Sequence, residues 1–434
     1  MSLCHKKVTL PIYLARNLQL QGRIMGIKQN LMPFARAFVT TALLALLAPL
    51  SWSSDKDETI EALRAQLDAL SARLEQLEAE QQKTEMSVQS LSINSTEATA
   101  KTKSTDRIKM NADLRYRFES IDAEGAPDRL RNRVRARVGI KADINENTLL
   151  GFELASGSDD PVSTNQTLGD DFSSKGVNID QAYVRFRPTG QDLDIYAGKF
   201  KNTLQRVGGN GLIWDGDLRP EGIGVKYGRG SLFINGLGTW INESKSGNDV
   251  LLLGAQTGIN VPAFESSKLI AGLGYYEYTG FKKPTDADSG ADNVAGNRLT
   301  ADGRYVSDFE LIEGFAELKF PTSLGKATVY ADYVQNLGAK DNDTGYVFGT
   351  TVKVSDWSLG WAYQDIEADA VYGVLTDSDF GGGGTDAKGH KLSTSYAFNK
   401  KVKVGGTLFL NDRNVDFGTE QDYTRFMLDL SVKY

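Results

Sequence analysis

The sequence predicts an all-β protein, a transmembrane β-barrel of about sixteen antiparallel strands that follows a short N-terminal coiled-coil helix. Three observations lead to this prediction. From residue 107 onward, apolar residues recur at every second position, as they do along one face of a β-strand. The connections between these runs alternate between short and long. The composition, with 44 Gly, 10 Pro, 17 Tyr and 19 Phe, suits a long succession of strands and turns.

Residues 1–53 have the pattern of an export signal. Basic residues precede an apolar run at 37–50, which is too short to span a bilayer and fits the apolar region of a signal peptide. The true start of translation is expected at Met25 or Met32, because the stretch before them has no evident role. The alternative for the apolar run is a helix buried in a protein core.

Removal of residues 1–53 changes the composition of the chain. Cys4, the single cysteine, is lost, so the mature protein must be stable without disulfides. Six Lys and Arg residues and no acid are lost with it, so the formal net charge falls by six, from −7 to −13. This acidic balance implies no nucleic-acid partner.

Residues 54–93 show a different period, that of a coiled coil. Apolar residues are spaced alternately three and four apart, which forms the seam of a heptad repeat. The seam residues are Ile60, Leu63, Leu67, Leu70, Leu74 and Leu77. A helix with such a stripe needs a partner to bury it, and self-association is the simplest choice. A helix folded against its own chain is the alternative, and 94–106 has the composition of a linker.

The segment 107–434 contains about sixteen strand-like runs, each close to the ten residues that a tilted membrane strand requires. The predicted runs are 107–118, 129–142, 148–156, 179–187, 193–201, 222–229, 231–241, 250–261, 268–279, 309–320, 326–335, 346–354, 357–366, 389–398, 401–410 and 423–434.

Short and long connections alternate along the chain. The long ones are 157–178, 202–221, 280–308, 367–388 and 411–422, and short turns lie between them. A membrane barrel with both termini on one side has short turns at that side and long loops at the other. A soluble sandwich has no reason to sort its loops in this way, and no sequence repeat suggests a solenoid. Because strands with unpaired edges are not stable in lipid, the sheet must close, and sixteen strands leave an aqueous lumen.

The face of each strand that lines the lumen is predicted from its alternation. In the run 129–142, Val134, Ala136, Val138 and Ile140 alternate with basic residues. An arginine facing lipid would cost roughly 2–4 kcal/mol near the midplane, so the basic face belongs to the lumen. The predicted basic lining residues are Arg115, Arg117, Arg131, Arg133, Arg135, Arg137, Arg185 and Arg187. Their mutual repulsion calls for nearby acids or a bound anion. The alternative is an ordinary solvated strand face.

The last strand suggests a role in assembly. Alternate residues are apolar up to the final position, an unusual composition for a terminus. These residues are Phe426, Leu428, Leu430, Val432 and Tyr434. With the alternating loops and the heptads, this ending resembles the Gram-negative outer-membrane porins that carry an N-terminal coiled coil before the barrel. The segment WDGDLRPEG (214–222) also looks like the porin segment at that place.

The resemblance implies several properties. The last strand would be the signal that the barrel-assembly machinery recognises. The protein would be a passive diffusion channel in the cell outer membrane, in contact with lipid and lipopolysaccharide, and a homotrimer. Its third outer loop, 202–221, would fold inward and narrow the pore.

Acidic residues of that loop would then face the arginines and set up a transverse field that orients polar solutes. The alternative is that these acids cap the turns of the loop itself. The residues expected at the constriction are Arg206, Trp214, Asp215, Asp217, Arg219 and Glu221.

Enzymatic readings find little support. The mature chain has no cysteine and one histidine, His390, whose neighbours show no catalytic pattern. The acidic string at 341–345 lacks the glutamate that a calcium loop requires, so no metal and no cofactor are predicted. The predicted function is a water-filled channel for ions and small hydrophilic solutes. The alternatives are an anion-preferring, solute-specific channel, and a structural anchor or adhesin tethered through the coiled coil.

Overall fold

The computed structural model describes residues 107–245, 249–280 and 295–434, together with the single positions 72 and 76. The chain divides into two compact units, Met1–Glu97 and Ala98–Tyr434, and the description here concerns the second. The predicted signal peptide, nearly all of the predicted coiled coil and the linker lie outside the described residues, so they stay predictions. Among the described residues, no helix combines the length and the apolar character needed to cross a membrane.

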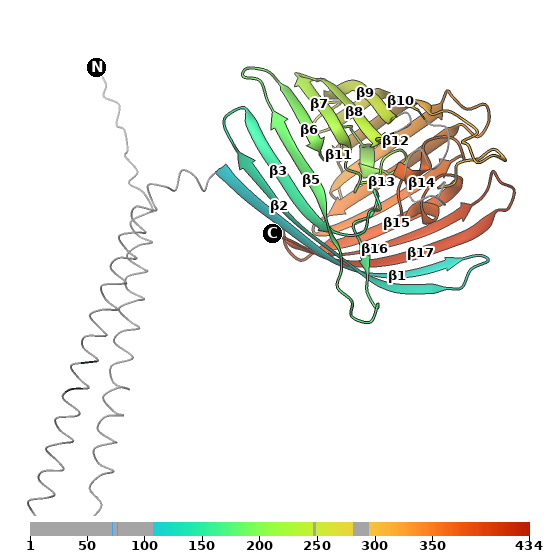
Figure 1. Cartoon of the computed structure of the whole chain (residues 1–434), viewed down its shortest axis with the longest axis horizontal. Helices are drawn as coiled ribbons and strands as arrows, with labels where there is room; N and C mark the ends of the chain where they lie inside the picture. The colour runs from blue at the N-terminus through green and yellow to red at the C-terminus, as the bar shows by residue number, and fades with distance from the viewer. Residues whose placement is uncertain (1–71, 73–75, 77–106, 246–248, 281–294) are drawn as a thin grey trace, which may run out of the picture. The chain divides into compact units, whose positions relative to one another are not determined.

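One closed antiparallel sheet forms the barrel. It contains 17 strands. One of them, β4 (Gln166–Thr167), is a two-residue strand inside a loop, where it pairs with Arg133 and Val134. The wall therefore has sixteen strands, which confirms the predicted number. The circle closes because β1 pairs with both β2 and β17, so the first and last strands lie side by side (Figure 1).

The wall strands follow one another in chain order. They are β1 (Ile108–Ala123), β2 (Arg129–Asp143), β3 (Thr148–Ser156), β5 (Val177–Phe186), β6 (Leu193–Lys199), β7 (Glu221–Arg229), β8 (Leu232–Asn242), β9 (Val250–Val261), β10 (Lys268–Thr279), β11 (Glu310–Pro321), β12 (Lys326–Asn336), β13 (Thr344–Val354), β14 (Trp357–Ile366), β15 (Ala387–Ala397), β16 (Val402–Arg413) and β17 (Gln421–Lys433).

Alternation along the strands sorts the side chains between the outside and the lumen. On β2, Leu130, Val138 and Ile140 are exposed on the outside, while the arginines between them point inward and are half-buried. On β17, the predicted assembly residues up to Val432 lie on the outer face, and Arg425 and Met427 are buried inside; the exposed Tyr434 follows the strand. The apolar exterior is the surface that lipid covers, as predicted from the period of two.

The two ends of the barrel differ in their connections. Both β1 and β17 have their terminal ends at the end with the short turns, 144–147, 187–192, 230–231, 262–267, 322–325, 355–356 and 398–401. The long loops lie at the other end. They are named L2 (157–176), L3 (200–220), L5 (280–309) and L7 (367–386), and residues 281–294 of L5 lie outside the described residues.

Much of the lumen is filled by L3 and L7, which fold inward and pack on the wall. Leu212, Ile213 and Trp214 of L3 are at most 2% exposed, and Tyr372 of L7 is 1% exposed. They form one apolar cluster with wall residues such as Tyr276. Removing so much aromatic and aliphatic surface from water favours the inward fold of both loops. The sequence analysis expected L3 to fold inward. It did not predict that L7 also folds inward, or that an apolar cluster forms inside the lumen.

Candidate functional site

Seven arginines stand on the lumen side of three neighbouring strands, and we call this set the arginine ladder. Register places Arg115 of β1 directly opposite Arg135 of β2, and Arg117 opposite Arg133. Like charges in such pairs repel and destabilise a sheet. The members of the ladder are Arg115, Arg117, Arg131, Arg133, Arg135, Arg137 and Arg425.

Acids of the wall itself neutralise part of the ladder. Glu119 of β1 is fully buried, and its carboxylate contacts Arg131 and lies 3.1 Å from Nη2 of Arg425. Asp429 of β17 accepts two hydrogen bonds from Arg117, at 2.7 and 2.8 Å. This two-bond geometry is the strongest form of an arginine–carboxylate pair.

A third wall acid, Asp113, pairs with the end of the ladder near the short turns. Its two oxygens accept hydrogen bonds from Arg135 at 3.0 Å and from Arg137 at 2.8 Å. Two ladder members remain. Arg133 lies 3.6 Å from Glu119 and donates to the carbonyl of Asn165 in L2 at 3.2 Å. Arg115 lies 4.0 Å from Asp429 and donates to the side-chain oxygen of Asn165 at 2.6 Å. The ladder is thus part of a continuous network of alternating charge.

L3 adds an acid to this network. Asp217 lies 3.1 Å from Nη1 of Arg137 and 3.7 Å from Nη1 of Arg135. Burial by itself would raise the pKa of Asp217, but the two arginines outweigh it and hold that pKa below its usual range. The carboxylate therefore stays ionised and ties L3 to β2.

L7 adds a second acid. Oδ2 of Asp379 accepts a hydrogen bond from Nη1 of Arg117 at 3.1 Å, and Oδ1 lies 2.8 Å from Nη2 of Arg425. Burial opposes ionisation, yet Arg425 and Arg117 hold the pKa of Asp379 well below its usual range. Both loops are therefore clamped to the same wall by ionised carboxylates.

The opposite end of L3 is fixed to the far wall by backbone and amide donors. The short 3₁₀ helix η2 (Val207–Gly209) packs against β11, β12 and β13. The Gly208 amide donates to Glu317 at 2.8 Å, and the Asn210 side chain donates to Asp332 at 2.8 Å. L3 thus crosses the lumen, with carboxylate contacts at both of its ends.

L3 and L7 are also bonded to each other. The Asp215 amide donates to the Leu375 carbonyl at 2.8 Å, and the Ser378 amide donates to the Asp215 carboxylate at 3.2 Å. The Asp377 amide donates to the Gly211 carbonyl at 3.0 Å. Burial, reinforced by the charge of Asp377, raises the pKa of Asp215 to about 7. Asp215 holds the loops together and is not bonded to an arginine.

Comparison with known proteins adds the family. A family model described as "Putative porin" matches residues 70–304 and 329–434, which is most of the chain. The chain belongs to this porin family. It is a non-enzymatic outer-membrane channel through which small solutes diffuse. No curated protein matches the sequence significantly.

The search of solved structures finds outer-membrane proteins, of which one, OprB, has a TM-score high enough to support the fold. The high-pH structure of OprB from Pseudomonas putida shares 12% identity, with a TM-score of 0.53, over 77% of this chain and 96% of that one. A Rh. blastica porin mutant shares 12% identity with a TM-score of 0.44, over 75% of this chain and all of that one. The OmpT loop-deletion mutant of Vibrio cholerae shares 13%, with a TM-score of 0.43, over 76% and 100%.

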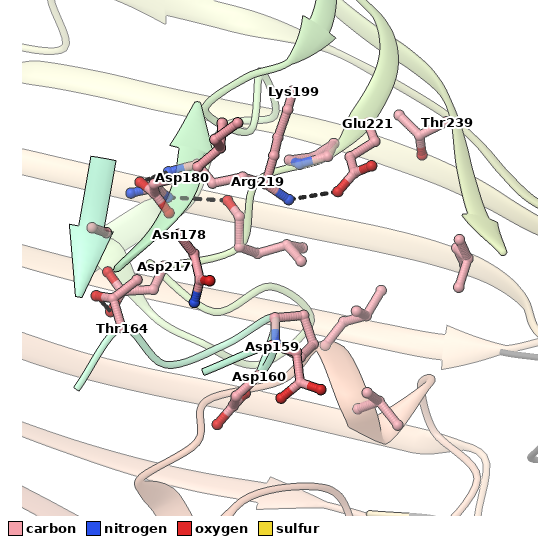
Figure 2. Close-up of a pocket in the computed structure, with 18 of the residues that line it drawn as sticks. Asp159, Asp160, Thr164, Asn178, Asp180, Lys199, Asp217, Arg219, Glu221 and Thr239 are labelled. Atoms are coloured by element: carbon pink, nitrogen blue, oxygen red, sulfur yellow. Dashed lines mark hydrogen bonds and ion pairs between the residues drawn. The ribbon is translucent and has the colours of Figure 1, made fainter. Parts of the chain in front are cut away.

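In this porin, the long loops lie at the extracellular end and the short turns at the periplasmic end. The extracellular side holds a cavity of about 350 Å³ (Figure 2). Asp159 and Asp160 of L2 lie at one side of it, and Asp180, Asp217 and Arg219 are among its other lining residues. A second cavity, of about 430 Å³, lies at the periplasmic side along β6 to β10. L3 contributes residues to both cavities, so it lies between the two entrances.

The structure places some predicted constriction residues apart from the ladder. Arg206 donates to the carbonyl of Asn210 at 2.9 Å and so stabilises L3 from within. Trp214 is buried and packs edge-on against Tyr276, 5.1 Å between ring centroids. Both residues belong to L3 and stabilise its fold inside the lumen.

The remaining predicted residues pair near the ends of the barrel. Arg219 donates to Asp180 at 3.0 Å, a pair that Figure 2 shows beside the extracellular cavity. Glu221 pairs with Lys199 at 2.6 Å, at the extracellular ends of β7 and β6. Arg185 and Arg187 both meet Asp194, at 3.7 and 2.6 Å, and the structure does not bring them to the ladder.

Sequence analysis missed most acids of the network. Asp113, Glu119 and Asp429 share the inward face of their strands with the arginines, so alternation was a sufficient signal for them. Arg425 was detectable in the same way. Asp379 carried no such signal, because it lies in a loop whose inward fold depends on packing.

Proposed function

We propose that solutes pass beside the arginine ladder and that the pore prefers anions weakly. The ladder's seven arginines meet five carboxylates, Asp113, Glu119, Asp217, Asp379 and Asp429. The ladder therefore keeps a positive excess although the whole chain is acidic. Charges farther than about 8–10 Å away are screened at physiological salt, so local charge matters more than net charge.

The observation that carries this proposal is the paired state of the ladder. Asp217 of L3 and Asp379 of L7 contact the ladder directly, whereas the sequence analysis expected acids of L3 alone to face the arginines. Neutralisation at contact leaves a weak field rather than a strong transverse one. A polar solute would exchange hydrogen bonds with a preorganised surface of guanidinium groups, and an apolar solute would not.

The test is a planar bilayer recording of the full-length protein in a potassium chloride gradient. A general porin conducts, and the reversal potential gives the anion preference. Replacement of Arg133 and Arg135 by Ala should shift the reversal potential toward cations. Failure to conduct would remove the proposal, and a cation preference in the unmodified protein would contradict the role of the ladder.

We further propose that the protein assembles as a homotrimer. The porin family and the predicted heptad seam of 54–93 support this, and three heptads with mixed Ile and Leu do not by themselves fix the number of helices. Chemical cross-linking of detergent-extracted protein should give trimers. A product that is only monomeric would contradict the proposal.

A further inference from the structure

The periplasmic mouth of the lumen carries opposed lysines, a charge pattern unlike that of the ladder. Three cross-strand pairs lie directly opposite each other at the strand ends: Lys109 and Lys141, Lys268 and Lys319, and Lys326 and Lys353. Each lies on the inward face of its strand, by alternation from buried residues of the lumen, and each is exposed.

Two further lysines complete this set, which we call the lysine ring. Lys403 of β16 and Lys433 of β17 are also exposed and lie on the inward faces at the same end. Lys403 lies directly opposite Ser431, two residues before Lys433 on the same inward face of β17. The ring therefore gathers ammonium groups from both sides of the barrel closure.

Few acids compensate the ring. Lys319 lies 2.6 Å from Glu317, and Lys109 lies 3.9 Å from Asp143. Within the described part of the chain, the other six ring lysines form no ion pair with a carboxylate. The ladder shows the contrast, because there every arginine meets an acid.

Opposed lysines without acids cost stability, because like charges directly across a sheet repel. Their spacing also has a use. Directly opposed residues hold their Cβ atoms about 4.5–5.5 Å apart, so two ammonium groups can bracket one tetrahedral oxyanion. Lysine is a compact point charge that suits phosphate, and successive pairs can hold successive charged groups of one solute.

We propose that the lysine ring is a binding site for multivalent oxyanions, with condensed inorganic phosphates as the matching chemistry. A single small anion gains little from a screened, exposed ring, whereas an anion with several charges engages several lysines together. The proposal rests on the anion-preferring passage proposed above and adds a solute class to it. The site would draw such anions to the periplasmic side of the pore and slow their passage there.

The experiment adds tripolyphosphate to one side of a bilayer that holds single channels of the full-length protein. Each channel's orientation is assigned from a cysteine in an extracellular loop, Lys340→Cys, because the predicted mature chain has none. Tripolyphosphate should block the potassium chloride current at lower concentration from the periplasmic side, and orthophosphate should block less. Lys326→Gln with Lys353→Gln should raise the half-blocking concentration about tenfold, which corresponds to two exposed ion pairs lost.

The matched control removes two charges at the other end, Lys175→Gln with Lys245→Gln, both in extracellular loops. It should leave the periplasmic block unchanged. A second readout is the denaturation temperature of the folded barrel. Tripolyphosphate should raise this temperature in the unmodified protein, and raise it less in the ring variant, because a ligand stabilises the state it binds.

The outcomes separate the two proposals. Equal block from both sides, or equal loss of block in the ring variant and the control, would overturn the lysine ring site while conduction and selectivity stand. Conduction without any block would overturn it as well. A protein that does not conduct but is still stabilised by tripolyphosphate would remove the channel proposal and keep the site.

Discussion

Oδ1 of Asp217 lies 3.1 Å from Nη1 of Arg137, so an acid of L3 contacts the arginine ladder directly. Asp215, two residues earlier, bonds to L7 instead. The sequence analysis assigned both acids to the constriction, whereas in the structure Asp217 contacts the ladder and Asp215 bonds to L7. This difference is the basis of the first prediction.

Asp217→Asn should shift the reversal potential toward anions, because Arg135 and Arg137 lose their loop partner. Asp215→Asn is the matched control in the same loop and should shift it much less. Both are measured in a potassium chloride gradient across a planar bilayer. Equal shifts in the two variants would show that contact with the ladder does not decide selectivity.

Glu119→Gln should destabilise the folded barrel strongly. Its carboxylate is fully buried and lies 3.1–3.6 Å from Arg425, Arg117 and Arg133. Removal of one partner of a buried ion pair costs about 3–5 kcal/mol, since the remaining charges lose their compensation. The measurement is the temperature at which the folded barrel converts to the unfolded form in detergent electrophoresis. Glu146→Gln, in an exposed turn, is the control, and a similar temperature for both variants would contradict the prediction.

Gly208→Ala should lift the tip of L3 from the far wall. A Cβ at this position would collide with the ring of Tyr330, and the backbone φ is +61°. Gly209→Ala is a matched control, because its φ is +66° but its Cβ would meet no atom within 4 Å. Both variants carry backbone strain, and only the first carries the collision. Single-channel conductance should rise, or become noisier, in Gly208→Ala alone. No difference between the two would mean that the tip does not set the pore width.

The stability of the L3–L7 contact should fall as pH rises through about 7. Burial and the charge of Asp377 raise the pKa of Asp215 to about 7, above its ordinary value of 3.8. The folded state therefore holds this proton more tightly, so the stability that protonation gives is full at low pH and is lost as the carboxyl ionises.

The measurement for this pH effect is the denaturation temperature of the folded barrel at pH 5, 6, 7 and 8, in the unmodified protein and in Asp215→Asn. The two proteins share all titrating groups except Asp215, so the difference between their denaturation temperatures isolates its ionisation. This difference should change between pH 5 and pH 8. A constant difference would contradict the effect.

Leu430→Asp with Val432→Asp should reduce the amount of folded protein in the outer membrane. Both side chains are exposed on the outer face of β17, where lipid covers them, and a charge there carries a cost that grows with depth. Ser431→Asp is the control, because its side chain faces the lumen between them. Fractionated membranes and heat-modifiable electrophoresis give the amounts. Normal insertion of the double variant would show that the last strand is not the assembly signal.

The sequence by itself determined the strands and their faces. The period of two fixed which side chains meet lipid and which meet the lumen, because alternation is a local property of the backbone. The register of β1 against β2 is also nearly local, since one short turn joins them, so the row of arginines was predictable from these two runs alone.

Only the tertiary structure decided what the arginines contact. Arg117 and Asp429 are 312 residues apart in the sequence and meet because the barrel closes between β1 and β17. Asp379 reaches Arg117 because L7 folds inward, and that fold depends on burying Tyr372 and Leu375 among residues of many strands. Barrel closure and loop packing depend on contacts made by the whole chain, so no local sequence pattern encodes the partner of each charge.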